Sequence, residues 1–192
     1  MDQDLFQKIY TRHLPHLKHL DVVNNTKMLI CFSGVAGVGK TTVATLLEER
    51  YRGVRINNDD IRAIMEELGI PYHVSQAPLQ EYLIALANRI AETKNGLIIL
   101  DSSIDRKYDM VRAWVDEHNM PMYIIRMEAA RETIHERIKN RNKEAASDYL
   151  RHMNVLYRDY EQFNATHKAN FVLNNDGSLS PDPLLRSLDL LL

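Results

Sequence analysis

A glycine-rich octapeptide constrains this sequence more than any other feature. It spans residues 34–41, reads GVAGVGKT and fits the phosphate-binding pattern GxxxxGK[ST]. The apolar run Met28 to Phe32 precedes it and the helix-like segment Thr42 to Arg50 follows it, which is the strand–loop–helix setting that this loop needs. Glycines let the backbone curl so that successive N–H groups converge on phosphate oxygens, and the next helix adds its positive end. The sequence therefore predicts a site for a nucleoside triphosphate.

Each part of the octapeptide has an expected role. Lys40 would reach the β- and γ-phosphates, and the Thr41 hydroxyl would complete the shell of a Mg²⁺ ion. A glycine-rich turn that fits the pattern by chance is the alternative, and the flanking strand and helix argue against it. The residues expected to bind the nucleotide are Gly34, Ala36, Gly37, Val38, Gly39, Lys40, Thr41 and Thr42.

Length and composition favour one ordinary globular domain. The chain has 192 residues, of which 45% are hydrophobic and 26% charged, enough for one buried core. Its formal net charge of −2 gives no broad field that would attract nucleic acid. No apolar stretch approaches the roughly 18 residues of a membrane span, and the first residues lack a signal pattern. We expect a cytoplasmic protein in which the single Cys31 is a buried strand residue rather than a reactive thiol.

Short apolar runs alternate with helix-like segments along the chain. Runs without strict alternation suit parallel strands that are covered on both faces, so we expect an α/β, doubly wound, mostly parallel five-stranded sheet with helices on both faces. The expected strands are Met28–Phe32, Gly53–Asn57, Leu97–Asp101, Met122–Met127 and Asn170–Leu173. The expected helices are Thr41–Arg50, Asp59–Leu68, Ala77–Lys94, Asp105–His118, Ala129–Asn140 and Ser147–Thr166. Asn95-Gly96 and Asn175-Asp176-Gly177 are predicted to be turns.

Two terminal segments lie outside this alternation. Residues 1–26 space apolar side chains at helical intervals that Pro15 interrupts, which predicts an N-terminal extension of one or two short helices. Residues 27–192 are then the P-loop domain. The leucine-rich end, Pro183 to Leu192, is expected to be a packing helix or an interface. The role of the extension and the oligomeric state stay open.

Carboxylates and an arginine follow the second expected strand. Ligands of parallel α/β sheets bind beyond the carboxyl ends of the strands, and Asp59 and Arg62 lie in the segment NNDDIR at that place. Phosphoryl transfer to a hydroxyl needs a carboxylate to orient or deprotonate the acceptor and a cation to hold charge. The simpler alternative is that Asn58 or Asp59 only caps the helix. The neighbouring P-loop favours the functional interpretation.

The third expected strand, Leu97 to Asp101, is an apolar run that ends in a carboxylate, as in a Walker B element. Asp101 would hold Mg²⁺ through water or bind the acceptor, so the predicted metal residues are Thr41 and Asp101. Such a run is also typical of a strand edge that meets a turn.

Basic residues cluster after the fourth strand, at Arg131, Arg137, Lys139, Arg141 and Lys143. Like charges four apart in a helix cost a few tenths of a kcal/mol, a cost that an anionic ligand would remove. We therefore expect a lid around residues 137–147 that closes Arg137 and Arg141 over the triphosphate. Interleaved glutamates leave a solvated helix of mixed charge as the alternative.

His13, His16 and His19 recur at intervals of three on the N-terminal segment. Pro15 disrupts their common face, and no cysteine or carboxylate completes a set of ligands, so a metal site is not favoured there.

Four elements occur in a set order along the chain: the P-loop, the segment NNDDIR, the strand that ends in Asp101 and the basic segment after the fourth strand. In this order they resemble the small P-loop kinases of the polynucleotide kinase and zeta-toxin group, described as AAA-33 predicted kinases. The resemblance covers about Met28 to Leu173, and the segment Ile56 to Arg62 has the form I-N-x-D-D-x-R of the phage polynucleotide kinase type. Ala146-Ser147-Asp148 also looks like the Ala-Ser-Asp that follows the lid in many of these kinases.

The resemblance implies roles for specific residues. Lys40 and Thr41 would handle phosphate and Mg²⁺, and Asp59 would activate the acceptor hydroxyl. Arg62 and Asp101 would contact the acceptor. Arg137 and Arg141 would be the lid arginines that stabilise the transferring phosphate, so the expected catalytic set is Lys40, Asp59, Arg62, Asp101, Arg137 and Arg141.

The function expected from these residues is that of an ATP-dependent kinase with ATP and Mg²⁺ as cofactors. Its acceptor is a hydroxyl of a small molecule, such as a sugar nucleotide, or of a nucleic-acid end, which the net charge does not favour. The preference for ATP over GTP follows from the family resemblance alone. The alternative is a regulatory NTPase without an acceptor. A guanine-type switch would need Asn-Lys-x-Asp, and the nearest fragment, Asn142 to Ala145, lacks the final Asp.

Overall fold

Five parallel strands form one sheet in the order β2-β3-β1-β4-β5, which confirms the predicted fold class. The computed structural model describes residues 1–71, 76–141, 146–177 and 179–192, without the side chains of residues 141 and 146–151. The strands are β1 (Asn24–Ser33), β2 (Val54–Asn57), β3 (Asn95–Ser103), β4 (Met122–Glu128) and β5 (Phe171–Asn174). Each lies over one of the apolar runs from which it was predicted.

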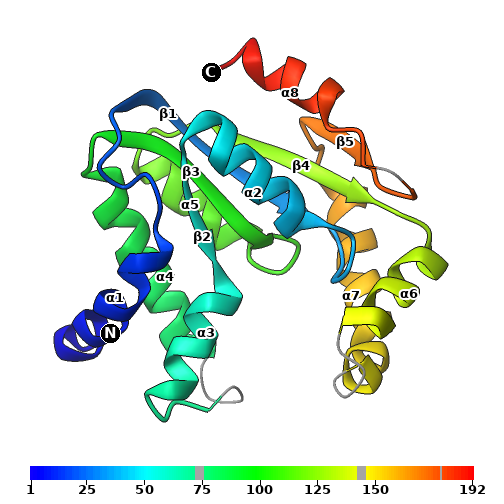
Figure 1. The fold of residues 1–192 in the computed structure, drawn as a ribbon, viewed down its shortest axis with the longest axis horizontal. Coiled ribbons are helices and arrows are strands. Elements are labelled where there is room, and N and C mark those ends of the chain that lie inside the picture. Colours follow the sequence, from blue (N-terminus) through cyan, green and yellow to red (C-terminus); the bar gives the residue numbers. More distant parts are fainter. Residues whose placement is uncertain (72–75, 142–145, 178) are drawn as a thin grey trace. The chain divides into compact units, whose positions relative to one another are not determined.

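The helices that alternate with these strands also follow the predicted order (Figure 1). They are α2 (Lys40–Tyr51), α3 (Asn58–Glu67), α4 (Gln76–Ala91), α5 (Tyr108–Glu117), α6 (Arg131–Arg141) and α7 (Ala146–Thr166). At the chain ends lie α1 (Gln3–His13), the 3₁₀ helix η1 (Leu14–His16) and α8 (Asp182–Asp189). No helix among the described residues is both long enough and apolar enough to cross a membrane.

The chain divides into two compact units. The first unit comprises Met1–Leu29, Ala44–Asp101 and Trp114–Pro121, and the second comprises Ile30–Val43, Ser102–Ala113 and Met122–Leu192. The first unit holds β2 and most of β3, the second holds β4 and β5, and β1 contributes residues to both.

In the first unit, β2 and β3 pair in parallel, with Asn57 opposite Asp101. The N-terminal segment forms α1 and η1, with Pro15 in the first turn of the 3₁₀ helix, and α1 packs against α3. Ile9 and His13 of α1 are buried. The extension is therefore a packed part of the unit that carries α3, and the domain boundary at residue 26 stays a prediction.

In the second unit, β4 and β5 pair in parallel, and α6 packs against α7. The C-terminal leucines were expected to form a packing helix or an interface. Leu184 and Leu188 of α8 are completely buried, and Ser187 on the same helix hydrogen-bonds to the hydroxyl of Tyr123 at 2.9 Å. Packing within the chain is thus confirmed for these two leucines.

The prediction of a turn at Asn95-Gly96 is wrong, because these two residues begin β3. The Asn95 side chain is fully buried and donates to the carbonyl oxygens of His19 and Arg52, each at 2.8 Å. A side chain at position 96 would meet the backbone of Thr26, since a Cβ there would lie 2.6 Å from the Thr26 carbonyl oxygen. Glycine is therefore required here by close strand packing rather than by a turn.

The helix predicted to begin at Asp105 begins at Tyr108 instead. Residues 105–107 form a turn in which the Lys107 N–H donates to the Ile104 carbonyl at 2.9 Å. This turn leaves the Asp105 carboxylate available to the P-loop, as described below.

Replacing Gly96 with alanine should destabilise the protein by about 1–3 kcal/mol, because the new methyl group overpacks the contact with the Thr26 backbone. Urea denaturation measures the change. Gly177→Ala is the matched control, since a Cβ at position 177 would have no heavy atom within 4 Å. Equal stability of the two variants would contradict the packing argument.

Candidate functional site

The P-loop of the second unit takes a backbone shape that depends on glycine. Gly34, Gly37 and Gly39 have φ angles of 150°, 81° and 105°, in the region that residues with side chains rarely adopt. The loop begins directly after β1 and ends where α2 begins at Lys40. The motif therefore produces the curled backbone that the sequence predicted.

Neighbouring side chains also crowd these glycines. A Cβ at Gly37 would lie 3.0 Å from Cγ1 of Ile138 on α6. A Cβ at Gly39 would collide with the side-chain amide nitrogen of Asn175, which follows β5. Helix α6 and the residue after β5, both in the same unit, thus pack closely against the loop.

Asn175 supports the loop, and the sequence analysis missed this role. Its side-chain Nδ2 donates to the Val38 carbonyl oxygen at 2.9 Å, and its backbone N–H donates to the Glu128 carbonyl at 2.7 Å. The residue is 7% exposed, so these are buried bonds. The sequence offered one signal, an amide side chain directly after an apolar strand, but we interpreted it as part of a turn.

Lys40 and two threonines lie at the first turn of α2. Nζ of Lys40 donates to the carbonyl oxygens of Gly34 at 2.9 Å and of Val35 at 2.8 Å. The ammonium group is therefore held inside the loop that it is predicted to serve. Thr41 and Thr42 are exposed at the positive end of the helix, where hydroxyl groups can reach a phosphate or its metal ion.

Asp105 is a second residue that the sequence analysis did not assign to the site. Its Oδ2 accepts a hydrogen bond from the Gly34 N–H at 3.3 Å, and its Oδ1 is buried without a hydrogen-bond partner among the described residues. A carboxylate thus contacts the first amide of the P-loop.

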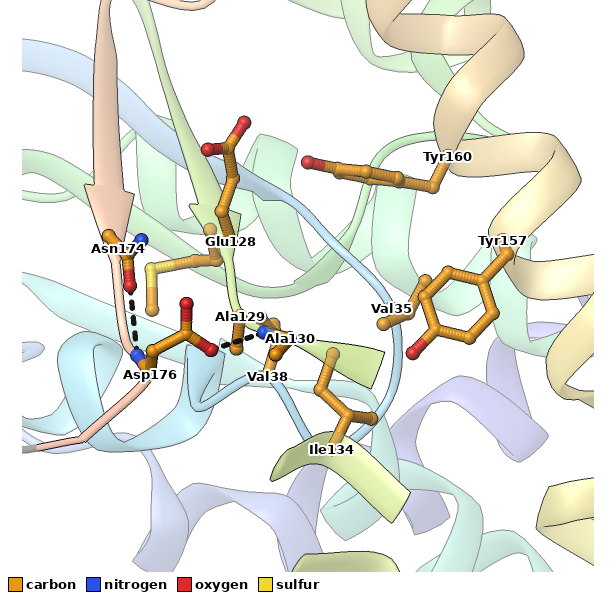
Figure 2. Close-up of a pocket in the computed structure, with 11 residues that line it drawn as sticks. Val35, Val38, Glu128, Ala129, Ala130, Ile134, Tyr157, Tyr160, Asn174 and Asp176 are labelled. Atoms are coloured by element: carbon orange, nitrogen blue, oxygen red, sulfur yellow. Dashed lines mark hydrogen bonds between the residues drawn. The ribbon is translucent and has the colours of Figure 1, made fainter. Parts of the chain in front are cut away.

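A cavity of about 320 Å³ adjoins the P-loop in the second unit (Figure 2). Polar groups in it are the carboxylates of Glu128 and Asp176 and the hydroxyl of Tyr157, which is buried without a partner among the residues described. Burial, followed by the charge of Glu128, raises the pKa of Tyr160 to about 12, so this hydroxyl stays protonated. The cavity is lined by Val35, Val38, Met127, Glu128, Ala129, Ala130, Ile134, Tyr157, Tyr160, Asn174 and Asp176.

Arg137 is the predicted lid arginine whose side chain is described. Its Nη2 donates to the backbone oxygen of Asn175 at 2.8 Å, and its Nη1 is buried with no hydrogen-bond partner in the described part of the chain. The structure therefore brings Arg137 to the residue that supports the P-loop. The side chain of Arg141 and residues 142–145 of the predicted lid, including Lys143, lie outside the described residues.

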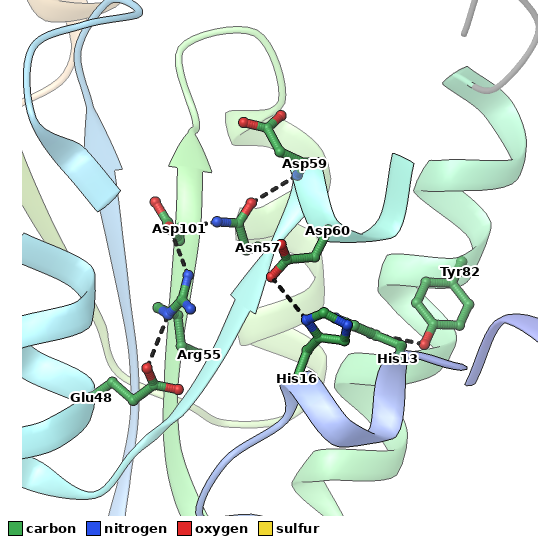
Figure 3. A network of polar contacts seen from close by, with 9 residues as sticks. All are labelled: His13, His16, Glu48, Arg55, Asn57, Asp59, Asp60, Tyr82 and Asp101. Carbon is green, nitrogen blue, oxygen red and sulfur yellow. Dashed lines mark hydrogen bonds and ion pairs between the residues drawn. The ribbon is translucent and has the colours of Figure 1, made fainter. Parts of the chain in front are cut away.

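In the first unit, Asp101 lies in a buried polar network (Figure 3). Its Oδ2 accepts hydrogen bonds from Nη1 of Arg55 and from Nδ2 of Asn57, both at 2.9 Å. Nε of Arg55 also donates to Oε2 of Glu48 at 3.1 Å. Burial alone would lower the pKa of Arg55, but the hydrogen bond and charge of Glu48, together with Asp101, raise it above its ordinary value.

The same network reaches the first turn of α3. The side chain of Asn57 caps the helix by accepting a hydrogen bond from the Asp59 N–H at 2.7 Å. The alternative that Asn58 or Asp59 is the cap is therefore wrong. The carboxylate of Asp59 is 81% exposed and lies 3.6 Å from Nη1 of Arg62, so the structure brings these two predicted residues together.

The N-terminal histidines contact residues of the first unit. Nδ1 of His13 lies 3.0 Å from the Tyr82 hydroxyl, and His16 lies 3.9 Å from Asp60, beside Asp59 on α3. Burial, and after it the charges of His16 and Arg55, lowers the pKa of His13 to about 4.

No three His, Cys, Asp or Glu side chains are grouped to hold a metal among the residues that the structure describes. A Mg²⁺ ion bound largely through phosphates needs only one or two protein ligands, and the exposed hydroxyl of Thr41 is of a type that can be one.

The sequence model of the AAA_33 family, described as AAA domain, matches residues 29–165. This range contains the P-loop, Asp59, Asp101 and Arg137 and leaves out α1 and α8. No curated protein sequence matches the chain.

Solved structures share the fold at low sequence identity. A chain from the PezAT chromosomal toxin–antitoxin system of Streptococcus pneumoniae is 14% identical, with a TM-score of 0.67 over 92% of this chain and 78% of that one. APS kinase from Mycobacterium tuberculosis, in complex with AMPPNP and APS, is 16% identical, with a TM-score of 0.55 over 88% and 99%. Shikimate kinase from Acinetobacter baumannii, in complex with shikimate, is 16% identical, with a TM-score of 0.54 over 86% and 93%. The chain thus has the fold of a kinase-like P-loop NTPase.

Replacing Asn175 with alanine should weaken ATP binding by about tenfold, because the buried Val38 carbonyl loses its donor and the P-loop loses its support. Titration with a fluorescent ATP analogue measures the affinity, and a melting curve shows that the variant is folded. Asn154→Ala, an exposed position on α7, is the matched control. An Asn175→Ala protein that is folded and binds ATP as tightly as the wild type would contradict this role.

His13 should make folding depend on pH below neutrality. Its pKa is lower in the folded chain than in the unfolded chain, so the unfolded state binds more protons as the pH falls. Between pH 6.5 and about 4 the wild type should lose up to about 3 kcal/mol of stability that a folded His13→Gln variant retains. Denaturation curves at several pH values measure this difference, with His135→Gln as the control. Parallel losses in the wild type and in His13→Gln would refute the assignment.

Proposed function

We propose, because this chain belongs to the AAA_33 family and carries a complete P-loop, that it is an ATP-dependent kinase that phosphorylates a hydroxyl group. The observation that carries the proposal is the curled glycine backbone with Lys40 held inside it at the start of α2. Names of structural neighbours, APS kinase and shikimate kinase, support a transferase rather than a regulatory NTPase.

On the donor side, the P-loop amides and Lys40 would bind the phosphates of ATP. For this, Nζ of Lys40 would exchange its bonds to the carbonyl oxygens of Gly34 and Val35 for phosphate oxygens. Thr41 would hold Mg²⁺, which neutralises phosphate charge when bound. The cavity next to the loop has the size of a small ligand site and would take the nucleoside end.

On the acceptor side, Asp59 would orient the hydroxyl group and accept its proton. The hydroxyl oxygen forms a bond to the γ-phosphorus, the bond from that phosphorus to the bridging oxygen breaks, and ADP leaves. Asp59 suits this role because its carboxylate is exposed while its backbone is fixed at the start of α3. Arg62 and Asp101 would contact the acceptor, and Arg137 and Arg141 would neutralise charge on the transferring group. Asp101 is also the proposed second residue at the metal.

We propose a small molecule, rather than a nucleic acid, as the acceptor. The net charge of −2 provides no general attraction for a polyanion. A panel of nucleosides, sugar nucleotides, aminoglycosides and oligonucleotides, each incubated with γ-labelled ATP and Mg²⁺, identifies the class. Labelling of the oligonucleotide end would show that a local site overrides the charge balance.

Lys40→Ala should abolish transfer by removing the charge at the phosphates. Asp59→Asn should lower kcat for the acceptor found in the panel by about 100-fold or more while the affinity for ATP stays within twofold. Asp60→Asn is the matched control for Asp59, since it removes the neighbouring carboxylate of the same helical turn. Equal losses of ATP affinity and turnover in Asp59→Asn would contradict its role at the acceptor.

A further inference from the structure

Two side chains of β2 converge on the buried Asp101. Arg55 and Asn57 are two residues apart, so they project from the same face of the strand. In the parallel pair, Asn57 lies directly opposite Asp101 and Arg55 lies opposite Ile99. One donor therefore reaches Asp101 from beside it and the other from further back along β2 (Figure 3).

Both donors bind the same oxygen of Asp101. Oδ2 accepts from Arg55 and from Asn57 at 2.9 Å each, and the side chain of Asp101 is 2% exposed. Hydrogen bonds to a charged, water-excluded carboxylate are short and strongly directional. These two bonds consequently fix where the carboxylate points.

Arg55 is itself anchored from behind. Its Nε donates to Oε2 of Glu48, a carboxylate on α2 that is fully buried. With Glu48 on one side and Asp101 on the other, the planar guanidinium group has little freedom to rotate. The orientation of Arg55 is thus set by the fold rather than by a ligand.

Asn57 makes a second contact with the other end of its amide group. While Nδ2 donates to Asp101, Oδ1 accepts from the Asp59 N–H at 2.7 Å. The two contacts require opposite atoms, so only one orientation of the amide satisfies both. One side chain therefore links the buried carboxylate of β3 to the helical turn that carries Asp59.

We propose that Arg55 and Asn57 are positioning residues, which together hold Asp101 and the first turn of α3 in the geometry needed by the acceptor. This inference rests on the proposed kinase function and adds two residues that it did not assign. Neither residue needs to touch the reacting atoms, and a displacement of about 1 Å in such a site can cost on the order of 100-fold in rate.

Asn57→Asp separates positioning from simple stabilisation. Aspartate is as good a helix cap as asparagine, so the bond to the Asp59 N–H is kept. The bond to Asp101 is lost, because a carboxylate has no N–H to donate and repels its neighbour. Asn57→Ala removes both contacts. Asn88→Asp is the matched control, because Asn88 is exposed on α4 and its Oδ1 only accepts a bond from Trp114, which aspartate preserves.

The experiment measures kcat and KM for transfer to the acceptor found in the panel, together with amide hydrogen exchange at Asp59. We expect Asn57→Asp to lose about 100-fold in kcat, with KM for ATP within twofold and with Asp59 exchange as slow as in the wild type. Asn57→Ala should show the same loss of kcat and faster exchange at Asp59. Asn88→Asp should match the wild type in both measurements. A folded Asn57→Asp protein with wild-type kcat, or one whose defect lies in KM for ATP, would overturn the proposal.

Failure of the proposed function would be recognised separately. If the wild type phosphorylates nothing in the panel, the kinase proposal fails and the positioning role at an acceptor fails with it. The hydrogen-bond link is then still judged by the exchange of the Asn57 side-chain amide protons, which should be slow in the wild type and fast in a folded Asp101→Ala variant, which has no acceptor at this position. Equal exchange rates would contradict the link itself, whatever the chain catalyses.

Discussion

The backbone of the P-loop is the constraint on which the rest of the second unit depends. Its three glycines adopt conformations that other residues rarely adopt, and a Cβ at Gly37 or Gly39 would crowd a neighbouring side chain. The neighbours are Asn175 after β5 and the isoleucines of α6. Loop shape is therefore not a local property of the motif but is held by the element that carries Arg137 and by the end of a strand far along the chain.

In the first unit, buried charged side chains hold the candidate site in place. Glu48, Arg55 and Asp101 form an ionic chain in which both carboxylates are buried. Replacing a buried ion pair by apolar residues is often neutral or stabilising, so such a chain is weak evidence for stability alone. Its role here is to orient the carboxylate of Asp101, because Glu48 holds Arg55 and Arg55 donates to Asp101.

Local sequence patterns predicted the strands, the helices and the P-loop, because apolar runs and glycine spacing can be recognised without knowledge of tertiary contacts. The features that these patterns missed depend on contacts between residues far apart in the sequence. Asn95-Gly96 has the composition of a turn, yet close approach to Thr26 makes it a strand. Asn175 and Asp105 were overlooked since their contacts to Val38 and Gly34 join segments far apart in sequence. The alternative of a helix cap at Asn58 or Asp59 lay one or two residues past the actual cap, Asn57, because several polar side chains in a row can each cap a helix. The catalytic roles of all six residues stay predictions, namely those of Lys40, Asp59, Arg62, Asp101, Arg137 and Arg141.

Phosphorus NMR of reaction mixtures with and without an acceptor tests the kinase assignment most directly. The protein is incubated with ATP, Mg²⁺ and the candidate acceptors, and the γ-phosphate signal is followed as it disappears. If the chain is a kinase, a phosphate monoester signal grows in step with ADP and only when the acceptor is present. Release of inorganic phosphate alone, at a rate that no added acceptor changes, would show a nucleotide hydrolase and contradict the kinase assignment.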